Sequence, residues 1–500
     1  AITRARQWLA ATDGKTDKST EQLANMLRDP NGVEFTMDFV DRVMRPEDDK
    51  VAANAMSKIT DNPKFLGPIN STLVGLGAFF GPILPNLVMP LARMRMKQMV
   101  GHLVLDAESD ALNKLLDKAA EKGEQLNLNL LGEAVLGEDE ARSRTERTLA
   151  LIRNPRVTYV SVKASSLCAQ LNHWDFEGSL QRLKDRLRPL YQEAIRRTPQ
   201  VFINLDMEEY HDLHLTIRLF TELLDEPEFK DLEAGIVLQA YLPDTYDALV
   251  HLAKYAKNRV ANGGAQIKVR LVKGANLSME HVQGESHGWA VAPYETKPEV
   301  DANYIRLLDF IIREEYADCV HVGIASHNLY TAAVAYELAE KRGVTRQLDS
   351  EMLQGMSPAQ QQAVHKVYGR QILYTPVVHM DDFDVAVSYL VRRLEENSAT
   401  QNFLYALFAP DEPGADQLTP IQDQERRFRE SVEKRWDTFA GAKRTQDRNA
   451  EVGSGRQAPR HGRFVNEPDT DPSLLANSAW ANEIVANDPG HHGIDEITDP

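Results

Sequence analysis

The nine residues from Tyr389 to Asn397 (YLVRRLEEN) gather side chains that could bind a carboxylate. Residues three and four apart share one face of a helix, so a helix here would align Tyr389, an arginine of the Arg392–Arg393 pair, and Glu396. A guanidinium holds a carboxylate through two parallel hydrogen bonds, and the aromatic ring would form a wall beside it. The same spacing also fits a helix whose charges face water, and spacing alone does not decide between these interpretations.

Eight short apolar runs of strand length alternate with amphipathic segments ahead of this helix. The runs are Leu126–Leu131, Val157–Val162, Val201–Leu205, Gly235–Leu238, Ile267–Val272, Val320–Ala325, Arg346–Met352 and Gln371–Thr375. Between them, leucines recur every three or four residues from Leu180 to Leu190, which is typical of a helix. Eight strand–helix units in about 270 residues predict an α/β fold, a (β/α)8 barrel. A doubly wound sheet is the alternative, but its GxGxxG turn is missing.

Polar residues lie at or near the ends of the predicted strands, where a barrel of this kind places its functional side chains. They are Glu133, Lys163, Ser165, Asp206, Gln239, Arg270, Lys273, Ser326, His327, Asn328, Glu351 and Tyr374. Each one alone could be a solvated loop residue or part of a structural ion pair. Their recurrence at strand ends indicates a binding site at the barrel mouth, where Glu133 would neutralise Arg393.

The chain offers few nucleophiles and no evident metal centre. Cys168 has no apparent activating base, and no Ser/His/Asp triad is visible. His211 and His214 lie three residues apart, but we find no Asp, Glu or third His placed to complete a set of ligands with them. The sequence therefore predicts surface histidines and no metal catalysis.

Composition narrows the class of protein further. Across 500 residues, 57 Lys and Arg face 74 Asp and Glu, a net charge of −17. That balance argues against a nucleic-acid partner, because neutralising phosphates needs surplus basic groups. Two cysteines and no secretory signal pattern predict a cytoplasmic protein.

One apolar stretch, Phe65 to Ala92, contains no charged residue. Four prolines interrupt it, and its longest proline-free run, Ile69–Gly81, has 13 residues. A helix that spans a bilayer needs about 20. We expect a hydrophobic hairpin, buried or at the surface, with peripheral membrane contact as an alternative. Residues 1 to about 60, which precede this stretch, look helical, and Arg93–Lys122, which follows it, has helical spacing.

Eight motifs carry a family resemblance along these strands and the final helix. They are LLGEA (130–134), YVSVKAS (159–165), INLDMEE (203–209), GIVLQAY (235–241), VRLVKGA (269–275), ASHN (325–328), EMLQGM (351–356) and YLVRRLEEN (389–397). In kind and order they resemble the proline dehydrogenase domain of the bifunctional proline utilisation A flavoenzymes. The segment HGRFVNEPDTDPSLLAN (461–477) is similar to the start of the aldehyde dehydrogenase module that follows in such proteins. The chain would then be the front portion of a longer bifunctional protein.

The resemblance implies a distorted (β/α)8 barrel with non-covalent FAD. It implies oxidation of L-proline to Δ1-pyrroline-5-carboxylate by hydride transfer to flavin N5. A membrane quinone would accept the electrons, which would give residues 65–92 a role at the inner face of the plasma membrane. The aldehyde dehydrogenase module would be the partner within the longer chain.

The resemblance also assigns roles to individual residues. Arg392, Arg393 and Lys163 would bind the proline carboxylate, with Glu133 paired to an arginine and Asp206 ordering the rim. Leu353, Tyr374 and Tyr389 would line the proline pocket. The cofactor-binding residues would be Gln239, Arg270, Val272, Lys273, Gly274, Ala275, Lys297, Ser326, His327, Asn328 and Glu396. Asn276 and Leu277 depart from the family, which has two aromatic residues there.

These expectations divide the chain into a helical region (1–122), an FAD-binding barrel (123–410) and a helix with a linker (411–500). Two other functions stay open. One is a lysine Schiff-base aldolase on the same fold, with Lys163 or Lys273 as nucleophile. The other is an interaction or membrane scaffold in which residues 1–122 matter and the barrel is inert. The visible spectrum of the protein would separate all three.

Overall fold

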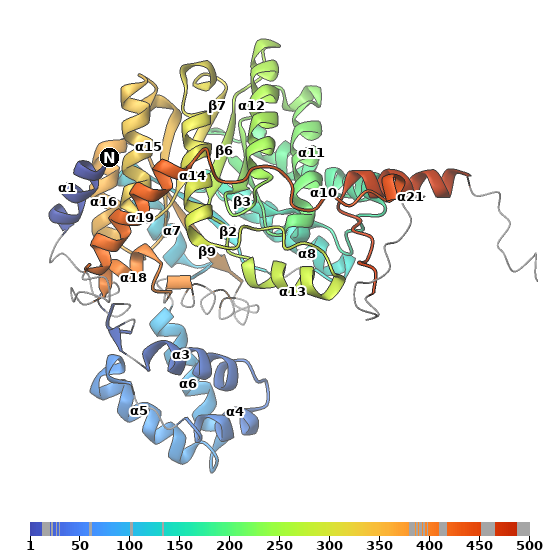
Figure 1. The fold of residues 1–500 in the computed structure, drawn as a ribbon. Coiled ribbons are helices and arrows are strands. Elements are labelled where there is room, and N and C mark those ends of the chain that lie inside the picture. The colour runs from blue at the N-terminus through green and yellow to red at the C-terminus, as the bar shows by residue number, and fades with distance from the viewer. Residues whose placement is uncertain are drawn as a thin grey trace, which may run out of the picture.

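The computed structural model describes most of the chain. The described residues are 1–12, 21, 24–26, 28–29, 31–59, 63–100, 104–132, 135–379, 386, 389, 393, 396–397, 399–409, 418–451 and 466–487. Figure 1 shows a barrel surrounded by helices and, set apart from it, a smaller group made of α3 to α6.

Eight parallel strands form a closed barrel. They are β2 (Glu124–Leu130), β3 (Tyr159–Lys163), β4 (Phe202–Asp206), β5 (Ala234–Gln239), β6 (Ile267–Val272), β7 (Val320–Ala325), β8 (Leu348–Leu353) and β9 (Gln371–Val378). The ring closes because β9 pairs with both β8 and β2, aligning Glu124 with Gln371. The two-residue β1 (Leu105–Asp106) extends this sheet beside β9. The predicted barrel is confirmed, and each of the eight predicted runs overlaps a strand.

Helices cover the outside of the barrel (Figure 1). After each strand from β2 to β8 come α8 (Glu138–Arg153), α10 (Phe176–Arg196), α11 (Leu213–Leu224), α12 (Thr245–Ala261), α14 (Lys297–Ile311), α15 (Leu329–Lys341) and α16 (Pro358–Tyr368). Additional helices are α7 (Asp110–Glu121), α9 (Ala164–Leu167), α13 (Leu277–His287), α18 (Phe403–Phe408), α19 (Pro420–Lys434), α20 (Arg448–Glu451) and α21 (Leu475–Asn487). The leucine repeat in α10 is fully buried, so the core between helices and sheet follows the sequence pattern.

Charged side chains fill part of the barrel interior, because alternate residues of a strand point inward. Lys268 of β6 pairs with Asp349 of β8 at 2.9 Å and with Glu351 at 2.5 Å, and Arg270 pairs with the same Glu351. Gly323 lies on the strand between them. A Cβ there would meet Glu351 at 2.2 Å, so only glycine leaves room for this network.

The N-terminal helices divide between two apolar clusters. Helix α1 (Ile2–Thr12) packs on α15 and α16 and contributes Trp8 to the core of the barrel. Helices α3 (Gly32–Phe39), α4 (Asp49–Met56), α5 (Gly67–Phe80) and α6 (Pro85–Val100) and the π-turn η1 (Val40–Met44) form a second cluster. This cluster reaches the barrel at Leu131 and Val378, where β2 and β9 end.

The stretch Arg93–Lys122 is not the continuous helix that its spacing predicts. Helix α6 ends at Val100, and β1 precedes α7. Between β1 and α7, Asp106 Oδ1 accepts the backbone N–H of Glu108 at 3.0 Å, and Ser109 Oγ donates to the carbonyl of Asp106 at 2.9 Å. Such side-chain bonds to the nearby backbone compete with a helix, and Ser109 caps the start of α7 by accepting the backbone N–H of Leu112.

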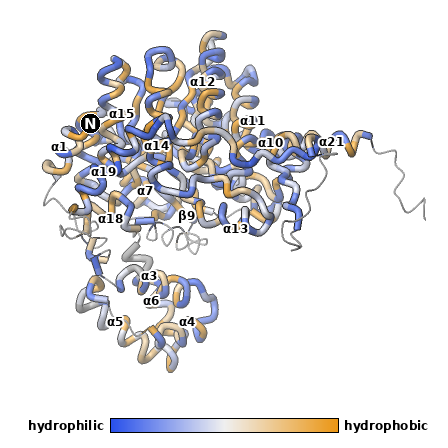
Figure 2. Tube along the Cα trace, viewed as in Figure 1, coloured by the Kyte–Doolittle hydropathy of each residue, from blue (hydrophilic) through white to orange (hydrophobic). Residues whose placement is uncertain are grey.

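Helices α5 and α6 form the expected hydrophobic hairpin, and much of it faces solvent. Figure 2 shows apolar residues along both helices. The exposed large side chains are Leu73, Leu76, Phe79, Phe80, Ile83, Leu84, Leu87, Leu91 and Met94. Among the helices described, none is long and apolar enough to cross a bilayer.

Candidate active site at the barrel mouth

Asp206, the last residue of β4, is a centre of hydrogen bonds at the barrel mouth. Its Oδ2 accepts Asn129 Nδ2 at 2.8 Å and the Tyr374 hydroxyl at 3.0 Å, and its Oδ1 accepts Asn204 Nδ2 at 2.9 Å. Burial raises the pKa of Asp206, against the opposing effect of nearby cations. Asp206 therefore fixes the Tyr374 side chain, as expected of an acid that orders the rim.

Arg270 lies beside Tyr374, with its guanidinium carbon 5.0 Å from the ring centroid. Its Nε donates to Glu351, which holds the guanidinium from the interior side. Burial opposes the charge of Arg270, but the carboxylates of Glu351 and Asp206 outweigh this effect and raise its pKa. Arg270 is thus a fixed, permanent cation at the mouth.

Arg393 lies close enough to Tyr374 and Arg270 for their charges to act on it. Its Nη1 donates to Glu396 Oε2 at 2.6 Å, and its guanidinium carbon lies 5.3 Å from the Tyr389 ring centroid. Tyr389, Arg393 and Glu396 therefore share one side of the helix, as their spacing predicts. The Arg393 Nε is buried and has no hydrogen-bond acceptor among the described residues. Glu133 and Arg392 lie outside the described residues. Among the residues described, the acid paired with Arg393 is Glu396.

Lys163, at the end of β3, is already paired. Its Nζ donates to Glu208, and Ser165 Oγ donates to the other oxygen of that carboxylate at 2.7 Å. Gln239 Nε2 donates to the carbonyls of Met207 and Glu208 at 3.2 Å each, which fixes the loop that carries Glu208. The Gln239 Oε1 is buried and receives no hydrogen bond from the described residues.

Two of the predicted cofactor lysines converge on one acid. Lys273 Nζ lies 2.5 Å and Lys297 Nζ 2.8 Å from Asp301 Oδ1. Burial, joined by the Lys297 charge, lowers the pKa of Lys273 to about 8, although Asp301 opposes the shift. The two ammonium groups outweigh burial at Asp301 and lower its pKa.

The segment that follows β6 makes a close turn. Val272 ends the strand, and Gly274 has a φ of +107°. A Cβ on Gly274 would meet the Tyr241 ring at 2.4 Å, so both the conformation and the space require glycine. Ala275 then lies exposed at the rim.

The residues after β7 serve mainly as supports for their neighbours. His327 Nε2 accepts the backbone N–H of Leu353 at 2.9 Å, and its Nδ1 lies 3.4 Å from Ser357 Oγ. Burial lowers the pKa of His327 to about 4, so the ring is neutral at pH 7. Asn328 caps α15 by accepting two backbone N–H groups, and Ser326 Oγ accepts the N–H of Asn328 at 3.1 Å. His327 thereby positions Leu353, a predicted wall of the pocket.

A cavity of about 610 Å³ lies elsewhere, between α1 and α16. Trp8, Thr12, Pro358 and Lys366 are among its lining residues, and none of the predicted site residues lines it. It lies on the outside of the barrel, so we do not assign it to the site.

Sequence reasoning missed several partners in this network. Asn129, Asn204 and Asp301 each hold a predicted site residue by a hydrogen bond or ion pair. The available signal is polar residues at alternate positions within a predicted strand, since these face the barrel interior. Asn129 shows it, whereas Asp301 lies on a helix and gives no such sign.

A closed parallel barrel with charged and hydrogen-bonded side chains at its strand ends has the arrangement in which barrel enzymes carry their active sites. The sequence profile of the proline dehydrogenase family matches residues 112–406, more than half of the chain. The chain therefore belongs to the proline dehydrogenase family.

Its relatives are bifunctional proteins. The bifunctional protein PutA of Klebsiella aerogenes is 28% identical over 327 residues, covering 61% of this chain and 23% of the relative. The structure of proline utilization A (PutA) from Corynebacterium freiburgense is 57% identical, with a TM-score of 0.68, covering 78% of this chain and 36% of that one. The structure of PutA from Bdellovibrio bacteriovorus inactivated by N-propargylglycine is 25% identical, with a TM-score of 0.73, covering 98% and 48%.

The match to PutA proteins confirms the resemblance to their proline dehydrogenase domain. The chain spans about a quarter of the length of the curated relatives it matches.

Proposed function

We propose that this chain oxidises L-proline to Δ1-pyrroline-5-carboxylate with non-covalently bound FAD. The oxidation removes a hydride from the ring carbon next to nitrogen and a proton from the nitrogen, which leaves a C=N bond. Membership in the proline dehydrogenase family supports the substrate. The aldolase and scaffold alternatives have no such support.

The observation that carries the proposal is the unfilled bonding capacity of Arg393. One of its nitrogens is occupied by Glu396, while its Nε is buried without an acceptor in the described residues. A buried donor that lacks a partner costs about 1–3 kcal/mol, so the site favours a ligand that supplies an acceptor. The proline carboxylate is such a ligand, and Tyr389 and Tyr374 would border it. We propose Lys163, Arg392 and Glu133 for the roles that the resemblance gives them.

The residues at the strand ends fit a flavin nucleotide. Gln239 Oε1 is a buried acceptor to which no described residue donates, and the rim carries the cations Arg270, Lys273 and Lys297, which suit an anionic diphosphate. We propose that these residues, together with Val272, Gly274, Ala275, the segment from Ser326 to Asn328, and Glu396, hold FAD. Bound FAD would supply the hydride acceptor. The protein residues bind the substrate, orient its ring carbon and shield it from water.

The test is the visible spectrum of the purified chain. We expect a flavin spectrum that L-proline bleaches without air, and acid precipitation should leave FAD in the supernatant. An apoprotein that has lost its flavin during purification is first incubated with added FAD. A chain that stays colourless after this step, or whose flavin L-proline does not reduce, contradicts the proposal. Trapping of a carbonyl substrate on Lys163 or Lys273 by borohydride would instead support the aldolase.

We further propose that a quinone accepts the electrons at a membrane surface, with the α5–α6 hairpin as the contact. Its exposed side chains include Phe79, which is 68% exposed, and Ile83, which is 64% exposed. Contiguous apolar surface on this scale marks an interaction site, and an amphipathic element of this kind can lie in the interface of a bilayer.

Replacing Phe79, Ile83 and Leu84 together with serine is expected to weaken binding to phosphatidylglycerol vesicles at least about tenfold. Each large apolar side chain contributes about 1.5–3 kcal/mol when fully buried, and about 1.4 kcal/mol corresponds to a tenfold change in affinity. Cosedimentation measures the binding, while turnover with a water-soluble dye acceptor should be unchanged. Val51→Ser, at an exposed apolar residue of α4, is the matched control. Equal sedimentation of the triple variant and the unaltered chain would exclude the hairpin.

A further inference from the structure

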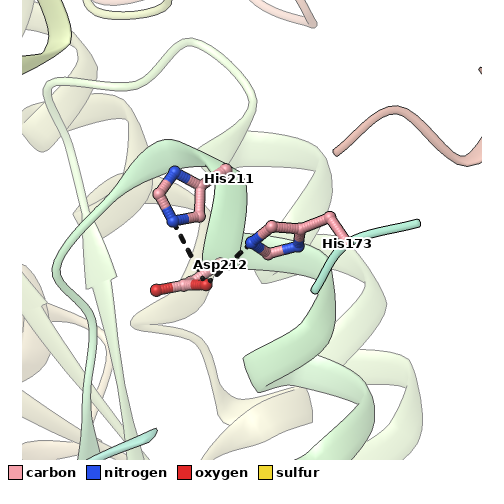
Figure 3. A group of neighbouring side chains, drawn as sticks. All are labelled: His173, His211 and Asp212. Carbon is pink, nitrogen blue, oxygen red and sulfur yellow. Dashed lines mark ion pairs between the residues drawn. The ribbon is translucent and has the colours of Figure 1, made fainter. Parts of the chain in front are cut away.

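A cluster of three potential metal ligands lies outside the site described above. Figure 3 shows His173, His211 and Asp212 directed toward one another. Asp212 Oδ1 lies 3.3 Å from His173 Nε2 and 3.5 Å from His211 Nε2, and the three ligand atoms all lie within 4.8 Å of one another. The sequence-based expectation that no acid or further histidine accompanies His211 is therefore wrong.

Two separate loops bring these residues together. His173 lies between α9 and α10, whereas His211 and Asp212 belong to η3 (Tyr210–Asp212), which follows β4. His214 does not join them: α11 begins only at Leu213, so His211 and His214 do not share a face of one helix. The fold, and not local spacing, creates the cluster.

The two separations from Asp212 suit a tetrahedral cation. Metal bonds from histidine nitrogen or carboxylate oxygen to zinc are about 2.0–2.1 Å long, which places tetrahedral ligand atoms about 3.3–3.4 Å apart. The distances from Asp212 Oδ1 to the two imidazole nitrogens match that separation. The Asp212 residue is only 7% exposed, and its Oδ1 accepts no hydrogen bond among the described residues.

The next layer of residues supports a metal-binding tautomer of His211. Its Nδ1 lies 3.2 Å from Glu209 Oε2, which can accept the Nδ1 proton, and 3.2 Å from Gln283 Nε2, a donor that would instead suit an unprotonated Nδ1. Donation of the Nδ1 proton to Glu209 leaves the lone pair of Nε2 directed toward Asp212. A carboxylate behind a histidine is the usual second layer of zinc sites, where it fixes the ring and raises its basicity.

Negative charge is in excess around the cluster. Asp212, Glu209 and Glu280 approach it, and Arg444, which lies 4.0 Å from Glu280, is shared with Asp471 at 3.1 Å. A bound cation would relieve the repulsion among these carboxylates.

We propose that His173, His211 and Asp212 bind a divalent cation of the zinc class, with water completing its coordination. Two imidazole nitrogens favour zinc over magnesium or calcium, which prefer oxygen ligands. The cation would join the loop after α9 to the loop after β4. The second loop also carries Glu208, the partner of Lys163, so metal binding would stabilise one wall of the barrel mouth. This site does not depend on the proposed oxidation of proline.

The test is titration of the untagged full chain with Zn²⁺ after removal of metals by a chelator and dialysis. We expect one tight equivalent by calorimetry, and a visible spectrum of four-coordinate cobalt when Co²⁺ replaces Zn²⁺. His173→Asn and Asp212→Asn should each weaken the tight site more than about 100-fold, because loss of even an outer-layer partner costs 10–100-fold. His214→Asn, next to the cluster but not part of it, should bind as the unaltered chain does.

The unaltered chain alone can overturn the proposal: absence of a stoichiometric Zn²⁺ site would do so without any variant. Equal affinity of Asp212→Asn and the unaltered chain would also overturn it, since the tight site would then lie elsewhere. Glu209→Gln removes only the outer carboxylate, and we expect it to lower the affinity about 10- to 100-fold while the cobalt spectrum persists. An unchanged affinity for Glu209→Gln would contradict the proposed orientation of His211.

Discussion

Replacing Arg393 with methionine is expected to raise the KM for L-proline about 10- to 150-fold, with a smaller effect on kcat. A hydrogen bond to a charged group contributes about 1.5–3 kcal/mol, which corresponds to this range of affinity. Methionine keeps an apolar stem against the Tyr389 ring, so the packing of the helix is largely retained. Glu396 would lose its partner, but its side chain is 44% exposed and water can solvate it.

Steady-state kinetics with a dye acceptor measure this effect. Arg346→Met is the matched control, because Arg346 pairs with Asp318 on an exposed surface and such pairs contribute little. An unchanged KM in Arg393→Met would mean that its guanidinium does not bind the carboxylate. The face formed by Tyr389, Arg393 and Glu396 would then be a structural one.

Glu351→Gln is expected to lower the free energy of unfolding by about 3–5 kcal/mol. Removing one member of a buried ion pair has an effect of this size because it leaves a charge without compensation in the interior. Glu351 is the carboxylate between Lys268 and Arg270, and it is only 1% exposed. Lys268 keeps Asp349, so the charge left uncompensated is mainly that of Arg270.

Urea denaturation followed by circular dichroism measures the change as a lower transition midpoint at an unchanged slope. The control is Glu315→Gln, whose pair with Lys257 is about half exposed and should contribute less than about 1 kcal/mol. A fall of less than about 1 kcal/mol for Glu351→Gln would show that the interior network does not stabilise the barrel. A lower FAD content of the Glu351→Gln variant would show that the network also holds Arg270 in the position proposed to bind FAD.

The barrel could be predicted from the sequence because each strand buries its own apolar run. The eight runs and the leucine repeat of α10 are local signals, and the structure places strands and a helix there. Strand β1 could not be predicted, since its two residues depend on pairing with the distant β9. Asp106 and Ser109 are residue types whose side chains bond to the nearby backbone and interrupt or cap a helix. The helical spacing on either side of them nevertheless led to the prediction of a helix.

The site was predictable to the extent that a parallel barrel gathers its strand ends. Asp206, Arg270 and Tyr374 meet at the mouth because each lies on a strand that points there. The partners that fix them come from elsewhere: Asp301 lies on α14, and Asn129 lies within β2. The roles given to Arg392 and Glu133 stay predictions, because both lie outside the described residues.

His173 shows the same limit for the proposed metal site. It precedes His211 by 38 positions and lies on a loop between two helices. Only the packing of that loop against the loop after β4 brings the two rings to a centroid distance of 4.6 Å. Sequence spacing detects ligands on one element and does not detect a pair made by two loops.

The pairing of β2 with β9 also has a consequence for how the protein is made. Leu130 pairs with Val377, so the ring cannot close until about 250 further residues have left the ribosome. At about 5–20 residues per second, roughly 12–50 s pass between the synthesis of β2 and that of its partner β9. Helix α1 also has no partner to pack against at first, because α15 and α16 are synthesised more than 300 residues later. During synthesis the growing chain therefore exposes an open sheet edge and the Trp8 face, the kinds of surface at which unfinished chains associate.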